Sequence, residues 1–265
     1  MMLDVNHVYK TFHPGTINER RALAGVDLHL EEGDFVTVIG GNGAGKSTLL
    51  NAVAGVWPVD GGSIVIDGND ITGLPDYKRA PFIGRVFQDP MMGTAPDMQL
   101  EENLALAYRR GKKLGLRWHI NREERDMYRE RLRELNLGLE DRLTTKVGLL
   151  SGGQRQAVTL LMASLQKPRL LLLDEHTAAL DPATAAKVLD LSDRIVRENG
   201  LTTMMITHNM KDAIRHGNRL IMMNKGEIIF DCRGEEKAKL TVEDLLEKFA
   251  QISGSTLDND RALLG

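Results

Sequence analysis

The sequence predicts an α/β protein: a parallel-sheet core that carries a phosphate-binding loop, a small antiparallel β subdomain and an inserted α-helical subdomain. Three observations lead to this fold class. Apolar, β-branched runs alternate with helical stretches, which is typical of parallel sheets covered on both faces. A glycine-rich segment, residues 40–48, joins one of these runs to a helix. From about residue 100 to 165, helical spacing replaces the strand pattern.

Bulk composition is that of an ordinary soluble globular protein. The 265 residues are 42% hydrophobic and 27% charged, enough for one large domain or two closely associated ones. The net charge of −3 gives no electrostatic reason to expect a nucleic-acid partner. No run approaches the ~20 apolar residues of a membrane span, and the N-terminus does not resemble a signal peptide. The lone Cys232 excludes an internal disulfide and favours a reducing compartment.

The phosphate-binding loop is the strongest local signal. Residues 40–47 fit the pattern G-x-x-x-x-G-K-[ST], in which backbone N–H groups converge on phosphate oxygens. Lys46 is expected to reach the outer phosphates, and the Ser47 hydroxyl to ligate Mg²⁺. An apolar run at 35–39 predicts a buried strand before the loop, and 47–54 reads as a helix after it. Strand, glycine loop and helix are the setting that this motif requires.

Two further strands are expected in the N-terminal part. Residues 23–30 alternate, with Val26, Leu28 and Leu30 on one face and polar residues on the other, and a turn at 31–34 closes this strand. Residues 61–68 form another short strand between glycine turns. Together they predict a small antiparallel sheet beside the nucleotide core.

Helices dominate the middle of the chain. Asn121, with Glu124 three residues later, predicts a capped helix. The apolar positions of the helices in this region recur at helical spacing: Leu100, Leu104, Tyr108, Tyr128, Leu132 and Leu135. The many Arg and Glu residues at 122–134 are interpreted as a solvated face rather than a docking surface. Ser151 and Gln154 form a capping-box pattern that opens a helix reaching to about Gln166, before Lys167-Pro168.

Strands and helices alternate again toward the C-terminus. Residues 170–173 and 203–206 read as buried strands, with a helix at 183–199 between them. Two short runs, 219–223 and 227–230, flank Asn-Lys-Gly as a hairpin. This turn chemistry explains the partial match of Asn224–Glu227 to a guanine-reading motif, so guanine specificity is rejected. A Thr-x-x-Asp start predicts a last helix at 241–252, followed by a loose polar end.

Two carboxylates stand where the strand at 170–173 ends. Ligands of open α/β sheets lie beyond the carboxyl ends of the strands, so Asp174 and Glu175 can meet the nucleotide. Asp174 suits the Mg²⁺ shell, usually through water, and Glu175 suits the activation of an attacking water. The alternative is that these acids only cap the next helix.

Leu150–Gln156, Leu-Ser-Gly-Gly-Gln-Arg-Gln, resembles the signature sequence of the ATP-binding cassette (ABC) ATPases. Gly152 and Gly153 are costly in a first helical turn, and a close approach of phosphate would explain them. The resemblance covers residues 2 to about 235 and implies a P-loop, RecA-like core. It implies one nucleotide-binding domain at 1–240, in which 1–88 and 168–240 form the core and 89–167 the helical subdomain, followed by a short helix and tail at 241–265.

The resemblance also implies roles for single residues. Phe12 resembles the aromatic that stacks on adenine, with Tyr9 as a weaker alternative; either residue can instead be simple core. Gln88 resembles the switch glutamine, Asp181 the residue that links two active sites, and His208 the γ-phosphate contact. The implied catalytic residues are Glu175, His208, Gln88 and Lys46, and the implied Mg²⁺ ligands are Ser47, Gln88 and Asp174. The implied ATP contacts are Phe12, Gly40, Gly41, Asn42, Gly43, Ala44, Gly45, Lys46, Ser47, Thr48, Ser151, Gly152, Gly153, Gln154 and Asp181.

The partners follow from the same resemblance. It implies a head-to-tail pair of cassettes, in which Ser151 and Gly153 close over ATP held by Lys46 of the other subunit. It further implies separate membrane permease subunits, an extracellular solute-binding protein reached indirectly, and a place on the cytoplasmic face of the membrane. Import is favoured, and residues 174–182 with 217–220 resemble cassettes for amino-acid-like solutes. The alternative is a soluble ABC ATPase of the iron–sulfur cluster assembly type.

Two features leave a choice open. His176 stands where this family usually has Pro; it is either a tolerated turn residue or a second imidazole near the γ-phosphate. The adjacent Met91 and Met92 follow Gln88, where the family places the groove for the coupling helix of the permease. Flexible methionine suits such a surface, but both side chains can also belong to the core.

Overall fold

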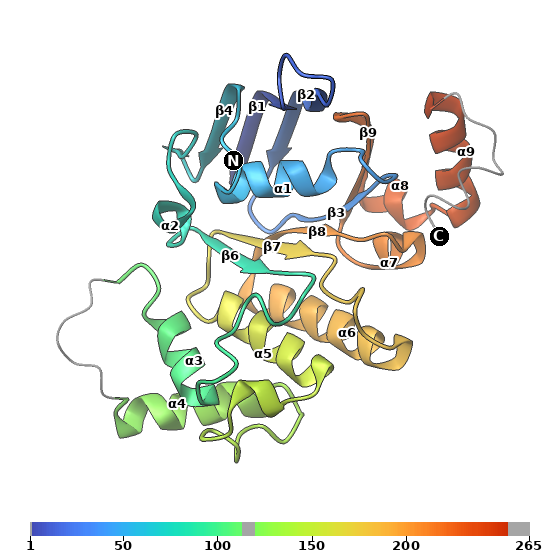
Figure 1. The fold of residues 1–265 in the computed structure, drawn as a ribbon. Coiled ribbons are helices and arrows are strands. Elements are labelled where there is room, and N and C mark those ends of the chain that lie inside the picture. The colour runs from blue at the N-terminus through green and yellow to red at the C-terminus, as the bar shows by residue number, and fades with distance from the viewer. Residues whose placement is uncertain (1, 113–119, 254–265) are drawn as a thin grey trace. The chain divides into compact units, whose positions relative to one another are not determined.

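The structure, a computed structural model, describes residues 2–112 and 120–253 (Figure 1). The chain divides into two compact units: Met1–Arg79 with Gly200–Gly265, and Ala80–Asn199. The α/β class is confirmed. The domain boundaries expected at 88, 167 and 240 stay a prediction, and the expected loose end after Ser253 lies outside the described residues. Within the described residues, no helix is long and apolar enough to cross a membrane.

An antiparallel sheet in the first unit has the strand order β2-β1-β4-β5. These strands are β1 (Leu3–Phe12), β2 (Arg20–Leu30), β4 (Gly61–Ile66) and β5 (Asn69–Asp70). The alternation along β2 is confirmed, because Val26, Leu28 and Leu30 are buried while the intervening residues are exposed. The sequence did not predict β1, the strand between β2 and β4. Its pairing shifts register between Val5 and Val8, where His7 has a left-handed φ of 47°, and this bulge interrupts the two-residue period.

The first unit also holds the strand that leads into the phosphate-binding loop. β3 (Phe35–Ile39) pairs in parallel with β8 (Thr202–Ile206) and with β9 (Arg219–Asn224). β10 (Glu227–Arg233) pairs antiparallel with β9, so the predicted hairpin is confirmed. Its turn residues Lys225 and Gly226 have φ of 47° and 84°, as a tight hairpin turn requires. β3 and β8 are buried throughout, which explains their uninterrupted apolar runs.

The described part of the first unit also contains the helices α1 (Lys46–Ala54), α2 (Asp76–Arg79), α7 (Met210–Arg215), α8 (Gly234–Ala238) and α9 (Val242–Ser253). The helix expected after the loop is α1, which begins one residue earlier than predicted. The start of α9 is confirmed, because the Thr241 hydroxyl accepts from the N–H of Asp244 at 3.1 Å. The sequence did not predict α2, α7 or α8, which are too short to show a helical period.

The described residues of the second unit, 80–112 and 120–199, form a pair of parallel strands and four α-helices. The strands are β6 (Ile83–Val86) and β7 (Leu170–Asp174). The helices are α3 (Leu100–Tyr108), α4 (Arg122–Arg133), α5 (Gly152–Ser164) and α6 (Pro182–Asn199). The capping box at Asn121 and Glu124 is confirmed. Tyr128 and Leu132 are buried on α4, and Leu135 is buried beyond its end.

Candidate nucleotide-binding site

The phosphate-binding loop runs from the end of β3 to the start of α1. Gly40 adopts a φ of 147°, and a Cβ there would lie 2.2 Å from the carbonyl oxygen of Met223. Gly45, with a φ of 105°, is the N-cap of α1 and supplies no capping side chain. The first N–H groups of α1 therefore lack a side-chain cap, and such a helix end favours a bound anion.

The ammonium group of Lys46 lies within this loop. Lys46 is only 5% exposed. Its Nζ donates to the carbonyl oxygens of Gly40 at 2.6 Å and of Gly41 at 3.3 Å. Ser47, next along α1, is exposed. The loop thus places a positive charge and a hydroxyl at the same helix end.

His208 lies at the same edge of the sheet as the loop. β3 and β8 are parallel with Val38 opposite Ile206, and Gly40 and His208 each follow two residues later. The His208 residue is exposed, and the N–H of Thr207 donates to the carbonyl oxygen of Val38 at 3.2 Å. The first unit therefore brings two of the predicted ATP contacts, the loop and His208, to one edge.

An aromatic pair marks the end of β1. The rings of Phe12 and Trp57 meet edge to face with their centroids 5.4 Å apart, and Phe12 is half-buried. Tyr9 is 40% exposed, so the interpretation of Tyr9 as simple core is wrong. Arg20, which pairs with Phe12 across the strands, donates from Nη2 to the carbonyl oxygen of Gly43 at 2.9 Å. Sequence reasoning missed this contact between β2 and the loop, because an exposed arginine carries no pattern.

The second unit gathers polar side chains at the ends of its own two strands. Val86 of β6 pairs with Leu173 of β7; Gln88 follows the first strand, Asp174 is the last residue of the second, and Glu175 follows it. The carboxylate of Asp174 forms an ion pair with Arg85, 3.3 Å from Nη2 to Oδ2. Burial lowers the pKa of Arg85, and the charge of Asp174 opposes that change. The sequence did not predict Arg85 as a neighbour of Asp174.

The backbone at Glu175 is unusual for a residue with a side chain. Its φ of 46° is left-handed, a conformation that costs roughly 1–2 kcal/mol for an L-residue. Such strain tends to gather at functional sites. The alternative that Asp174 or Glu175 caps the following helix is wrong: Asp181 takes that position, accepting from the N–H of Thr184 at 3.1 Å. Hydrogen bonds with the side chain and with the backbone N–H of Thr184 lower the pKa of Asp181.

The signature segment begins α5 as predicted. Ser151 and Gln154 form a reciprocal capping box, with the Ser151 hydroxyl accepting from the Gln154 N–H at 3.3 Å. Gly153 has a packing reason that the sequence did not reveal, since a Cβ there would lie 2.2 Å from the Thr184 methyl group. The close approach of phosphate stays a prediction for this helix end.

Two side chains of α5 join the signature helix to the segment around Gln88. The buried Gln156 donates from Nε2 to the carbonyl oxygen of Phe87 at 3.1 Å. Arg155 contacts the sulfur of Met91. The segment around Gln88 and helix α5, which Ser151 caps, are therefore joined by direct side-chain contacts.

His176 is part of the packing of the second unit. It is 2% exposed, and its Nε2 lies 2.9 Å from the hydroxyl of Ser192 on α6. A buried ring that is hydrogen-bonded to a helix fits the tolerated turn residue better than a phosphate contact.

Each unit thus carries its own part of the chemistry. The first provides an anion-binding loop, a buried ammonium group, an exposed imidazole and an aromatic pair. The second provides two carboxylates and an amide at one edge, together with a capped glycine-containing helix end. The groups of the first unit suit the binding of phosphate, and the carboxylates of the second suit a hard cation or the activation of water.

Comparison with known proteins also indicates an ATP-binding protein. A family model described as ABC transporter matches residues 23–178. The tyrosine transport ATP-binding protein of Clostridioides difficile is 47% identical over 254 residues, 94% of this chain and 98% of that protein. The xylose/arabinose import ATP-binding protein of Sulfolobus acidocaldarius is 33% identical, over 94% of this chain and 95% of that protein.

Solved structures agree in fold. One is a dimeric post-hydrolysis state of an ATP-binding cassette bound to ADP and phosphate, with a TM-score of 0.74 and 31% identity. It covers 88% of this chain and 98% of that one. Another is the ADP conformation of an ATP-binding cassette of an ABC transporter, with a TM-score of 0.75, 28% identity, and coverage of 96% and 99%.

Proposed function

Because this chain belongs to the ABC transporter family, as an ATP-binding subunit whose ATP hydrolysis is coupled to transport, we propose that two copies of it clamp ATP and drive a separate permease. The observation that carries the proposal is the loop at 40–48, with the buried Lys46 ammonium against its carbonyls and an uncapped helix end behind it. That arrangement suits a triphosphate.

Roles for the remaining residues are proposed from the family to which the chain belongs. In the first unit, the loop residues hold the phosphates, His208 contacts the γ-phosphate, and Phe12 stacks on adenine. In the second unit, Glu175 activates the attacking water, and Gln88 touches Mg²⁺ and that water and senses the partner domain. Asp181 links the two sites of the pair. The left-handed backbone at Glu175, where β7 ends, agrees with this role, because strained backbone is common at functional sites.

Magnesium is the metal that fits this donor set. Ser47, Gln88 and Asp174 offer oxygen ligands, which hard divalent cations prefer. No group of three or more His, Cys, Asp or Glu side chains in residues 2–112 and 120–253 is arranged to hold a metal by itself. Mg²⁺ usually binds through substrate phosphates and few protein ligands, so these residues would share it with ATP. When bound, it neutralises charge on the phosphates.

We further propose that the pair is head-to-tail. Ser151, Gly152, Gly153 and Gln154 would close over ATP held by Lys46 of the second copy. The 31% identical cassette is a dimer in a post-hydrolysis state bound to ADP and phosphate, which supports a paired assembly. Two helix N-termini, those of α1 and α5, would then face the triphosphate from opposite sides, and each favours negative charge. ATP would join the copies, and hydrolysis would release them.

The segment after Gln88 is the proposed docking surface for the permease. Met91 is 40% exposed and Met92 is 69% exposed, so the alternative that both belong to the core is wrong. Asn103 of α3 holds the end of this segment, accepting from the N–H of Ala95 at 2.8 Å and donating to its carbonyl oxygen at 3.1 Å. Exposed, flexible methionine side chains on a loop that is anchored by hydrogen bonds can bind a helix of a partner protein. This would place the chain on the cytoplasmic face of the membrane.

The transported solute is proposed to be an amino acid or a similar small molecule. The 47% identical relative is named for tyrosine transport, which supports this class over sugars. An extracellular solute-binding protein would deliver the solute, and a thermal-shift screen of that protein should respond to tyrosine. Nothing in the fold or in these relatives favours the alternative of iron–sulfur cluster assembly.

Charging the methionine surface should prevent recovery of the permease. We expect Met92→Glu, alone and combined with Met91→Glu, to abolish copurification with the permease in detergent, because a buried carboxylate at an apolar interface is strongly unfavourable. ATP binding should be unchanged. Tyr77→Glu is the matched control, since Tyr77 is 70% exposed and lies on α2 in the other unit. Copurification of the permease with the variant that carries both methionine changes would contradict the proposed docking surface.

A further inference from the structure

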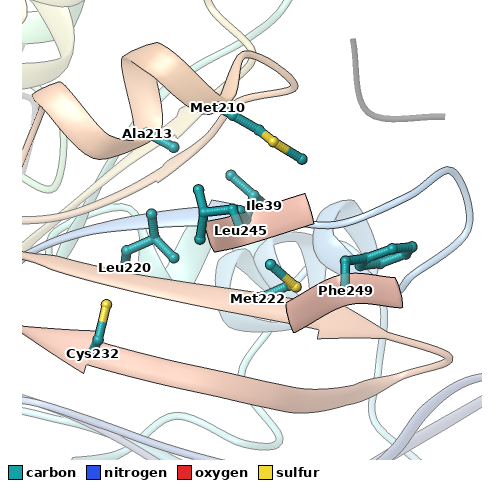
Figure 2. Packing of buried hydrophobic residues seen from close by; sticks show 8 residues of the cluster. All are labelled: Ile39, Met210, Ala213, Leu220, Met222, Cys232, Leu245 and Phe249. Carbon is teal, nitrogen blue, oxygen red and sulfur yellow. The ribbon is translucent and has the colours of Figure 1, made fainter. Parts of the chain in front are cut away.

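The C-terminal helix α9 packs against the base of the phosphate-binding loop. Leu245 and Phe249 of α9 are buried in a cluster that we call the α9 cluster (Figure 2). Phe249 is only 5% exposed. The other members come from the strands and the helix around the loop: Ile39, Met210, Ala213, Leu220, Met222 and Cys232. All of these residues belong to the first unit.

Phe249 reaches the loop itself. Its ring atom Cζ lies 3.7 Å from the position that a Cβ on Gly41 would take, which is ordinary van der Waals contact. Ile39, the last residue of β3, belongs to the same cluster. The carbonyl oxygen of Gly41 accepts from Lys46 Nζ at 3.3 Å. The ring tip therefore lies beside Gly41, the glycine whose carbonyl oxygen accepts from the phosphate-binding ammonium group.

The same helix also packs beneath the segment that carries His208. Met210, the first residue of α7, is in the α9 cluster and follows His208 by two positions. Asn209 fixes the start of α7, accepting through Oδ1 from the N–H of Lys211 at 2.9 Å. A displacement of α9 would therefore reach both ATP-contacting segments of this unit.

We propose that Phe249 is a positioning residue for ATP binding, which holds Gly41 and the carbonyls that Lys46 contacts in the geometry that receives the triphosphate. The proposal rests on the proposed function, because it assumes that the loop at 40–48 binds ATP. A phenyl ring suits this task, since it fills a large volume with little conformational freedom. A side chain without the ring tip leaves the underside of Gly41 without contact, and the loop can relax into that space.

Three variants of the full chain separate positioning from packing. Phe249→Leu keeps a smaller apolar side chain at this position and removes the ring tip. Phe249→Met restores the reach with a flexible chain. Leu220→Ala leaves a cavity in the same cluster away from the loop: Leu220 is fully buried and pairs with Thr37, two residues before Ile39.

The dissociation constant for Mg–ATP is measured by calorimetry at a temperature at which circular dichroism shows every variant folded. We expect Phe249→Leu to raise it about fivefold, because small misplacements of binding groups weaken binding, while the melting temperature falls modestly. Phe249→Met should bind nearly as the wild type does. Leu220→Ala should lower the melting temperature more than Phe249→Leu and leave the affinity unchanged. The KM for ATP should rise more than kcat falls in Phe249→Leu.

Wild-type affinity in Phe249→Leu would overturn the proposal, as would equal weakening in Leu220→Ala, because the ring would then be ordinary core. Lys46→Ala in the same assay tells this failure from failure of the proposed function. If Lys46→Ala also binds Mg–ATP normally, the assignment of the loop is wrong, and the role of Phe249 fails with it.

Discussion

Lys46→Ala is expected to abolish tight ATP binding. The ammonium group is buried in the loop and held by two of its carbonyl oxygens, so it is already positioned for phosphate. Removing one partner of a buried, charged contact costs about 2–5 kcal/mol. That range corresponds to an affinity loss of roughly 30-fold to several thousandfold. Calorimetry with Mg–ATP measures it directly.

Lys239→Ala is the matched control for this experiment. It removes the same charge from the same unit, but its side chain is 79% exposed and makes only a long ion pair with Glu235. Its affinity for ATP should equal that of the wild type. Normal binding by Lys46→Ala, with the protein folded, would show that ATP binds elsewhere.

Glu175→Gln is expected to stop turnover without loss of ATP binding. Gln has the shape of Glu but cannot accept the proton of the attacking water. A positioned general base typically contributes about 10²–10⁴-fold to a rate, so hydrolysis should fall by that factor. ATP would then stay bound, and the proposed dimer should accumulate. The measurements are steady-state phosphate release and sedimentation velocity with and without Mg–ATP.

Glu198→Gln controls for the loss of a carboxylate on the same unit, since Glu198 is exposed near the end of α6. It should hydrolyse ATP at the wild-type rate and show no added dimer. Near-normal phosphate release by Glu175→Gln would refute the role of that residue. A stable ATP complex without dimer would keep the role of Glu175 but contradict the paired assembly.

The sequence revealed most of the fold wherever a local pattern was complete. β3 and β8 are buried on both faces, and their apolar runs marked the strands to within one residue. The capping boxes at Asn121 and Ser151 marked the starts of α4 and α5, because a cap depends on residues three apart. β1 escaped prediction because the bulge at His7 breaks its alternation.

The site was predictable in its motifs but not in its supporting contacts. Arg85 beside Asp174, Arg20 on Gly43 and Phe249 under Gly41 join residues that are distant in sequence. Residue spacing in the sequence does not predict such pairs, because they depend on how strands and helices pack. For Gly153, the sequence predicted the close approach of a phosphate. The structure shows a second reason for glycine there, which is its packing against Thr184.

The shared ATP site is tested most directly by mixing two inactive variants. Lys46→Ala removes the loop contact, and Ser151→Asp keeps a good N-cap while placing negative charge against phosphate. If each site takes Lys46 from one copy and Ser151 from the other, a mixed pair contains one intact site. Hydrolysis in an equal mixture should then recover to at most about a quarter of the wild-type rate, because half of the pairs are mixed. A mixture as inactive as its components, although the two variants associate, would contradict the head-to-tail pair.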